Sequence, residues 1–142
     1  MILNRAQIGQ RIPQQGAMCL LERALSWDEN HIVCAAISHR DPANPLRSGD
    51  ILPAVCGIEY AAQAMALHAS LSGAGGKPGL LARARDVELN TARLDEFAGE
   101  LTIRAEKLAL ENELALYRFS IFSGPRELLR GRLAVMLGAA RA

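Results

Sequence analysis

Apolar and polar residues alternate along several segments of the chain with the two-residue period of a strand that buries one face. The alternation is clearest in residues 101–106, where Leu, Ile and Ala alternate with Thr, Arg and Glu. Further strands are predicted over residues 18–27, 31–38, 80–89, 116–122 and 128–137. Turn-forming residues at 28–30 and 123–125 join the first two and the last two of these segments, which predicts antiparallel hairpins.

One segment has the composition of a buried helix. Residues 53–71 are Ala-rich, and Glu59 is the only charged residue among them. A helix that is apolar on every side is expected inside a domain. Pro53 suits a first helical position, and the glycines between Gly73 and Gly76 are expected to end the helix. Residues 39–52, with two prolines and a glycine, predict a long loop of the kind that often carries function.

Strands on either side of one long helix predict an α+β fold, an antiparallel sheet wrapped around a central helix. Before them, residues 1–16 form a lead-in where Leu3 and Ile8 could anchor a short amphipathic turn that Pro13 ends. The 142 residues correspond in length to a single domain, spanning 1–142.

Composition and charge narrow the function. A formal net charge of +1 argues against a nucleic-acid partner. Neither a secretory signal nor an apolar run of about 20 residues is found, so a soluble, cytoplasmic protein without a membrane partner is expected. Cys19, Cys34 and Cys56 lie in apolar stretches without metal-ligand spacing, so we expect buried free thiols, no disulfide framework and no metal site.

The segment ILPAVCGIEYAAQ (51–63) resembles the helix start of the beta-hydroxyacyl-acyl-carrier-protein dehydratases, a hotdog-fold family with the pattern (V/I)-(M/L)-P-G-V-x-x-x-E-x-x-A-Q. Pro53, Glu59, Ala62 and Gln63 match it in register. The opening RIPQQGAMCLLERALSWD and the closing strands ELTIRAEKL and ELLRGRLAVML are also similar. The combination HRDPANPLR…LP…GIEYAAQAM resembles the branch of predicted dehydratases associated with aryl-polyene lipid clusters. The resemblance implies a single hotdog domain.

The resemblance also implies a reaction: dehydration of a 3-hydroxyacyl thioester, carried on acyl carrier protein, to the trans-2-enoyl form in fatty-acid or polyene-type lipid synthesis. The family uses a loop His as base and a helix carboxylate as acid, and Glu59 matches the acid. The family's His lies eight residues before the helix proline, at the position of Pro45 here. His39, fourteen residues before Pro53, is the candidate base. The structural alternatives are that Glu59 pairs with an arginine or caps a loop, and that His39 anchors the loop.

Four residues are candidate substrate-binding positions. Ala54, at the family's glycine position, and Gly57 lie at the helix N-terminus, where backbone N–H groups favour negative charge. Asn44 could position a water or the substrate hydroxyl, although Asn before Pro more often shapes a turn. Gln63 follows Glu59 by four residues on one helix face and could orient it, or form an interface hydrogen bond.

The remaining histidines are expected to be structural. His31 lies where a strand begins and is expected in solvent. His68, nine residues after Glu59, points to another helix face and is expected to pack or to end the helix.

Partners are implied in the same way. Arg47, Arg83 and Arg85, together with Arg40, could bind the acidic carrier protein or its phosphopantetheine arm, or simply lie in solvent. No other cofactor is implied. Because hotdog sheets pair edges across a subunit interface, a homodimer or higher oligomer is expected, or a heterodimer with another hotdog subunit. Two alternative functions stay open: a hotdog acyl thioesterase, and a non-catalytic subunit supporting an active dehydratase partner.

Overall fold

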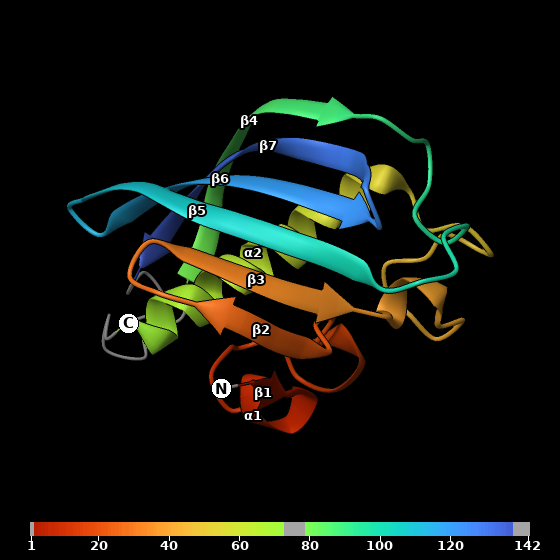
Figure 1. Ribbon diagram of the computed structural model, residues 1–142, viewed down its shortest axis with the longest axis horizontal. Helices are drawn as coiled ribbons and strands as arrows, with labels where there is room; N and C mark the ends of the chain where they lie inside the picture. The colour runs from red at the N-terminus through yellow and green to blue at the C-terminus, as the bar shows by residue number, and fades with distance from the viewer. Residues whose placement is uncertain (1, 73–78, 138–142) are drawn as a thin grey trace.

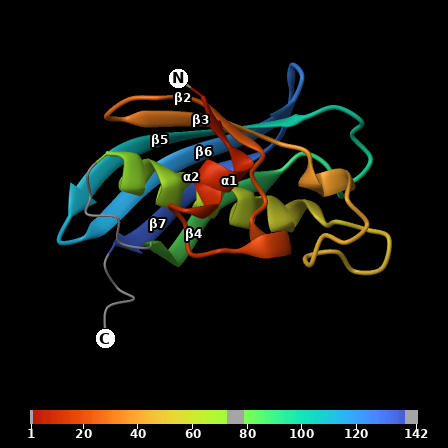
Figure 2. The same cartoon turned by 90° about the horizontal axis from the view of Figure 1, so that it is seen from below.

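The computed structural model describes residues 2–72 and 79–137, and it shows a seven-stranded sheet curved around one long helix. The strands lie in the order β1-β2-β3-β5-β6-β7-β4, and every neighbouring pair is antiparallel. Helix α2 crosses one face of the sheet, and helix α1 lies on the same side (Figures 1 and 2). The predicted α+β class is therefore confirmed.

The elements have the following bounds. The strands are β1 (Leu3–Asn4), β2 (Arg23–Trp27), β3 (His31–Ala36), β4 (Gly79–Leu89), β5 (Leu101–Glu111), β6 (Leu114–Ser123) and β7 (Arg126–Leu137). The α-helices are α1 (Arg5–Gly9) and α2 (Gly57–Leu71), and three 3₁₀ turns are η1 (Gly16–Met18), η2 (Ser38–Arg40) and η3 (Ala54–Cys56). No helix among these is long and apolar enough to cross a membrane.

Helix α2 is buried, as its composition predicts. It packs against β3, β4, β5, β6 and β7, and most of its residues are inaccessible to solvent. The segment opens differently from the prediction, because Pro53 precedes the 3₁₀ turn η3 and the α-helix begins only at Gly57. Its last helical residue is Leu71, and the glycines expected to end it lie outside the described residues.

The alternating strands face the helix as expected. Leu101, Ile103 and Ala105 of β5 are buried, as are Tyr117 and the other inward-facing residues of β6. A two-residue turn at Asn112 and Glu113 joins β5 to β6, and both residues have positive φ. This is the backbone that matches the right-handed twist of a hairpin.

Predicted boundaries in the first hairpin were also wrong. The first strand of the hairpin begins at Arg23 rather than at residue 18, because the preceding residues follow the turn η1. The Gln63 side chain bonds this stretch, accepting from Leu20 N at 2.9 Å and donating to Met18 O at 2.7 Å. The second strand ends at Ala36, and the predicted loop begins with the 3₁₀ turn η2, which contains His39.

The two edges of the sheet differ. At one edge, β1 contributes two residues that pair with β2. At the other edge, β4 is eleven residues long, and among the described strands it pairs with β7 alone. Register shifts interrupt that pairing on both sides of Arg83–Arg85, and Asp86, within the second shift, has a positive φ of 53°. Such bulges twist a strand locally.

Candidate active site

Glu59 lies in the first turn of helix α2, and the side chain is partly exposed. Its Oε2 accepts hydrogen bonds from Nε2 of Gln63 at 3.2 Å and from Nε2 of Gln14 at 3.4 Å. Neither of the structural alternatives for Glu59 appears among the described residues, where it pairs with no arginine and caps no loop. Two neutral amides hold the carboxyl instead.

Gln63 stands next to Glu59 on the helix, as the four-residue spacing predicts. It is fully buried. Its side chain also bonds the backbone of Met18 and Leu20, so it joins helix α2 to the segment before β2. The orientation of the Gln63 amide is thus fixed by backbone groups on both sides, with the N–H directed at the carboxyl.

A second buried polar group connects helix α2 to the loop. The Tyr60 hydroxyl lies 2.8 Å from Oγ of Ser38 and accepts a hydrogen bond of 3.1 Å from Nδ2 of Asn44. Asn44 also donates to Ser38 O and accepts from Leu46 N. Burial raises the pKa of Tyr60, so the phenol stays protonated. Asn44 is 6% exposed, and these contacts shape its own loop; its contact with a substrate stays a prediction.

Arg47 holds the same loop from the outside. Its guanidinium donates to three backbone carbonyls, those of His39 at 3.1 Å, Asp41 at 2.9 Å and Asp50 at 2.8 Å. These bonds bring the two ends of the loop together. Sequence reasoning assigned Arg47 to carrier-protein binding, which stays a prediction, and missed the loop contacts because no local pattern marks them.

His39 is fully buried in the turn η2. Its Nε2 lies 2.8 Å from the Phe97 carbonyl, so Nε2 carries the ring proton and donates. Nδ1 is buried, and none of the described residues forms a hydrogen bond with it. Burial lowers the pKa of His39, and the backbone of Phe97 and Gly99 opposes this only in part. The ring is therefore neutral near pH 7, with its free lone pair on Nδ1. No hydrogen bond joins His39 to Glu59 within the described part of the chain.

The start of the helix segment is held by residues 91–97. Ala54 N donates to Ala92 O at 3.0 Å, and Leu52 N donates to Oδ1 of Asp95 at 2.9 Å. A hydrogen bond from Arg93 holds the pKa of Asp95 well below its usual range, so its carboxylate accepts across the working pH range. The Ala54 N–H, a candidate donor to the thioester, has a partner in this chain, and its substrate role stays a prediction.

Gly57 is where helix α2 meets the sheet most closely. A Cβ added there would lie 2.8 and 2.9 Å from the two methyl carbons of Leu129 and 3.2 Å from Cδ1 of Ile121. This close packing accounts for the glycine. Its predicted contact with substrate is untested.

The other predicted residues lie apart from Glu59. Arg83 and Arg85 are exposed on the edge strand β4. His31 begins β3, and its Nδ1 lies 2.8 Å from Oδ1 of Asp28, with 42% of its side chain exposed. His68 is buried against Tyr117, as the packing interpretation predicted. Cys19 and Cys34 are buried free thiols and Cys56 is half-buried.

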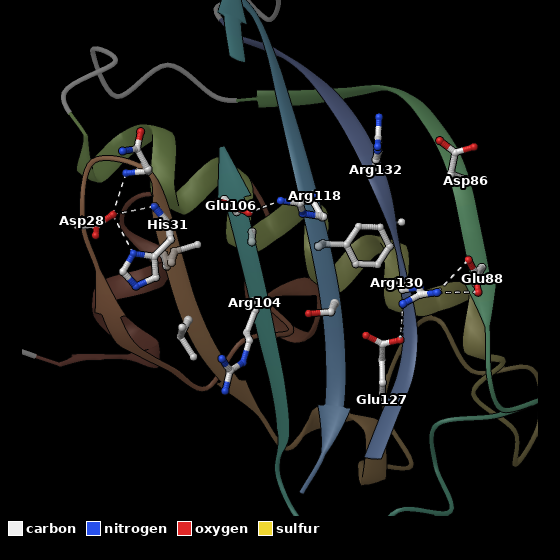
Figure 3. Close-up of a pocket in the computed structure, with 17 residues that line it drawn as sticks. Asp28, His31, Asp86, Glu88, Arg104, Glu106, Arg118, Glu127, Arg130 and Arg132 are labelled. Carbon is white, nitrogen blue, oxygen red and sulfur yellow. Dashed lines mark hydrogen bonds and ion pairs between the residues drawn. The ribbon is translucent and has the colours of Figure 1, made fainter. Parts of the chain in front are cut away.

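A hollow of about 930 Å³ lies on the outer face of the sheet, opposite helix α2 (Figure 3). Charged side chains line it and pair with one another: Arg118 with Glu106 at 2.8 Å, and Arg130 with Glu88 at 3.2 Å. A second hollow, of about 700 Å³, lies beside η2, and His39 is among its lining residues. The hollow on the outer face does not contain Glu59 or His39.

No curated protein matches this chain. Among solved structures, it is similar to the dehydratase heterocomplex ApeI:P from Xenorhabdus doucetiae, with 23% identity over 92% of this chain and 90% of that chain and a TM-score of 0.80. It is also similar to zebrafish thioesterase superfamily member 2, with 16% identity over 96% of this chain and 99% of that chain and a TM-score of 0.66.

A third similar structure is the thioesterase HI1161 from Haemophilus influenzae, with 17% identity over 98% of this chain and 94% of that chain and a TM-score of 0.64. These likenesses confirm the predicted hotdog fold. The sequence model of the ApeP dehydratases matches residues 6–140, nearly the whole chain. By this match the chain belongs to the ApeP-like dehydratase family.

Proposed function

We propose that this protein dehydrates a 3-hydroxyacyl thioester, carried on the phosphopantetheine arm of acyl carrier protein, to the trans-2-enoyl form in lipid or polyene synthesis, with Glu59 as the acid. The observation that carries the proposal is the state of the Glu59 carboxyl, whose Oε2 is held by two amides while Oε1 has no hydrogen-bond partner among the described residues. A carboxyl held at one oxygen can present the other to a leaving hydroxyl. Membership of the ApeP-like dehydratase family supports the reaction type.

The reaction needs a base at C2 and an acid at C3. The base removes the C2 proton, and the C–H electrons form the new C2–C3 double bond. The C3–O bond breaks, and the departing oxygen takes the proton of Glu59 and leaves as water. Proton transfer from the base back to the carboxylate then restores both groups, so that the overall change is the loss of one water.

His39 is the proposed base. A neutral imidazole with a free lone pair is the form that can remove a proton, and the Phe97 contact leaves that lone pair on Nδ1. Burial, which lowers the pKa of His39, keeps the ring in this form near pH 7. The loop bonds made by Arg47 and Asn44 fix the backbone on both sides of the ring.

A second hotdog subunit belongs to this proposal. Within the described part of the chain, the edge strand β4 pairs on one side only, and a second chain could extend the sheet there. The exposed Val55, with 52% of its surface accessible, stands beside the helix start as an apolar contact for such a partner. The likeness to a heterocomplex supports a hotdog heterodimer in preference to a chain acting alone.

The deciding experiment is a mass-spectrometric assay of 3-hydroxyacyl-acyl-carrier-protein with the purified chain, alone and with a hotdog partner subunit. Dehydration, or hydration of the enoyl form, should be lost in Glu59→Gln and in His39→Ala. Arg118→Gln on the outer sheet face is a matched control that should keep wild-type turnover. Release of free acid instead of the enoyl product would point to a thioesterase, the name that two of the similar structures carry.

One observation favours a second candidate, a subunit that supports an active hotdog partner. Nδ1 of His39 is covered by protein in this chain, so the ring cannot touch a substrate unless the turn η2 shifts. If turnover depends on an added partner and survives His39→Ala in this chain, the supporting role is correct and the partner supplies the base. Turnover by this chain alone would contradict it.

A further inference from the structure

Gln14 approaches Glu59 from the lead-in segment, which has hydrogen bonds of its own that do not involve Gln14. Gln15 donates through Nε2 to the carbonyls of Gly9 at 2.6 Å and Ile12 at 3.0 Å, and Arg5 donates to Gly16 O at 2.7 Å. Ile12 itself is buried in the core. These contacts fix the backbone on both sides of Gln14, so its side chain reaches Glu59 from a rigid base.

The Gln14 amide is oriented by the carboxyl alone. Its Nε2 donates to Oε2 of Glu59, while its own Oε1 is buried without a partner in the described part of the molecule. A buried acceptor without a partner is unfavourable, so this orientation of the Gln14 amide is expected only if its N–H group gains a hydrogen bond in return. The orientation of the Gln14 amide therefore indicates that Oε2 of Glu59 is the acceptor of its N–H group.

Both amides act on the same carboxyl oxygen. Gln63, from the helix, and Gln14, from the lead-in, each donate to Oε2 of Glu59. An oxygen that accepts two N–H donors is a poor place for a proton, because a proton there would face two others. The two carboxyl oxygens thus have different roles: Oε2 is held, and Oε1 carries any proton.

We propose that Gln14 is a positioning residue of the active site, which with Gln63 holds Oε2 of Glu59 so that Oε1 alone delivers the proton. This inference rests on the proposed function, in which Glu59 is the acid, and deepens it by assigning the oxygen and a second supporting residue. Gln63 alone leaves the carboxyl free to turn about its terminal bond, and Gln14 removes that freedom.

The test combines kinetics with a direct reading of the contact. Gln14→Met keeps the length of the side chain and removes its N–H, and Gln10→Met is the matched control on the exposed end of the same segment. We expect Gln14→Met to lower kcat about tenfold, a part of the 10²–10⁴ typical of general acid catalysis, with KM and melting temperature nearly unchanged. In ¹⁵N spectra, the side-chain amide of Gln14 should shift on Glu59→Ala, and that of Gln15 should stay.

Three results would overturn the proposal: a raised KM with kcat unchanged, which would place Gln14 on the substrate; an equal loss in Gln10→Met; or a Gln14 amide signal unmoved by Glu59→Ala. If the wild-type chain removes no water with or without a partner while the Gln14 signal still moves, the proposed function fails but the positioning of Glu59 by Gln14 is upheld.

Discussion

The Tyr117 hydroxyl donates a hydrogen bond of 2.6 Å to Nδ1 of His68, joining strand β6 to helix α2 inside the core. On its other side, Nε2 of His68 donates to Asp28 O at 2.8 Å. The two rings meet edge to face. This arrangement favours a neutral imidazole, because a protonated His68 would donate to the Tyr117 oxygen and leave the buried Tyr117 O–H without its acceptor among the described residues. Burial accordingly lowers the pKa of His68 and raises that of Tyr117.

The first prediction concerns stability against pH. A buried His whose pKa is lowered in the folded chain takes up its proton on unfolding, so the unfolded state binds more protons as the pH falls. The stability from His68 is therefore present above the unfolded pKa of about 6.5 and is lost as the pH falls below it. The slope approaches about 1.4 kcal/mol per pH unit for each such residue, and burial lowers the pKa of His39 in the same direction.

Urea unfolding at pH 7.5, 6.5 and 5.5 measures this dependence. We expect His68→Gln to have a lower free energy of unfolding at pH 7.5 and a smaller slope than the wild type. Tyr117→Phe keeps the imidazole and should keep most of the slope. A wild-type stability that stays constant down to pH 5.5 would contradict the prediction.

A second prediction concerns the Tyr60 hydroxyl, which joins helix α2 to the loop of residues 38–50. Tyr60→Phe leaves the ring in place but removes the acceptor of one Asn44 N–H and one of the two partners of Ser38 Oγ. Unpaired buried polar groups cost about 1–3 kcal/mol, so we expect the free energy of unfolding to fall by that amount. Hydrogen exchange should quicken in residues 38–50 more than in β5. Equal acceleration in both segments would mean that the hydroxyl stabilises the whole fold and not this loop.

The third prediction tests the close approach at Gly57. Gly57→Ala places a methyl group against Leu129 and Ile121, and overpacking of this kind costs about 1–3 kcal/mol. This exceeds the gain of up to about 1 kcal/mol from replacing a helical Gly by Ala. A net loss of stability is expected in thermal unfolding, and it should shrink when Leu129→Ala is added. Simple additivity of the two substitutions would show that they do not touch.

A fourth prediction distinguishes arginines that bind the carrier protein from an arginine that stabilises a loop. Arg83→Glu and Arg85→Glu, on the exposed edge strand, should weaken binding of acyl carrier protein while leaving the melting temperature unchanged. The weakening should shrink at high salt, since exposed charges are screened. Arg47→Met should instead lower stability and speed proteolysis of the loop, because three carbonyls lose their donor. Carrier binding that is unaffected by both β4 variants would remove these residues from that role.

Much of the fold follows from local pattern. The alternation in β5 and β6 and the single charge in α2 are properties of neighbouring residues, and they predict both the sheet and the buried helix. Element boundaries that depend on residues far away in the sequence could not be predicted from local pattern. The segment after Met18 pairs with the Gln63 side chain, which is far away in the sequence. The turn between β5 and β6 was not found either, because Asn112 precedes a Glu and not the Gly that marks such turns.

The residues of the candidate site likewise fall into those that local sequence predicts and those that only the fold reveals. Glu59 could be found because a lone carboxyl in an apolar helix is unusual, and Gln63 because it shares a helix face with it. Gln14 could not, since a Gln in a lead-in segment carries no periodic signal and meets Glu59 only after the chain folds. Tyr60 was hidden for the opposite reason: an aromatic residue in an apolar helix is expected in the core, and only the fold shows that its hydroxyl bonds the loop.

The unequal edges of the sheet limit how chains can associate. Between two copies of this chain, a strand-to-strand contact through β4 uses the same edge of both molecules, so a pair formed in this way has consumed both long edges. The remaining edges end in β1, with two residues followed directly by a helix, and they offer too short a template to recruit a third chain. Growth by strand addition would therefore stop at two subunits, which guards the molecule against polymerising into fibres.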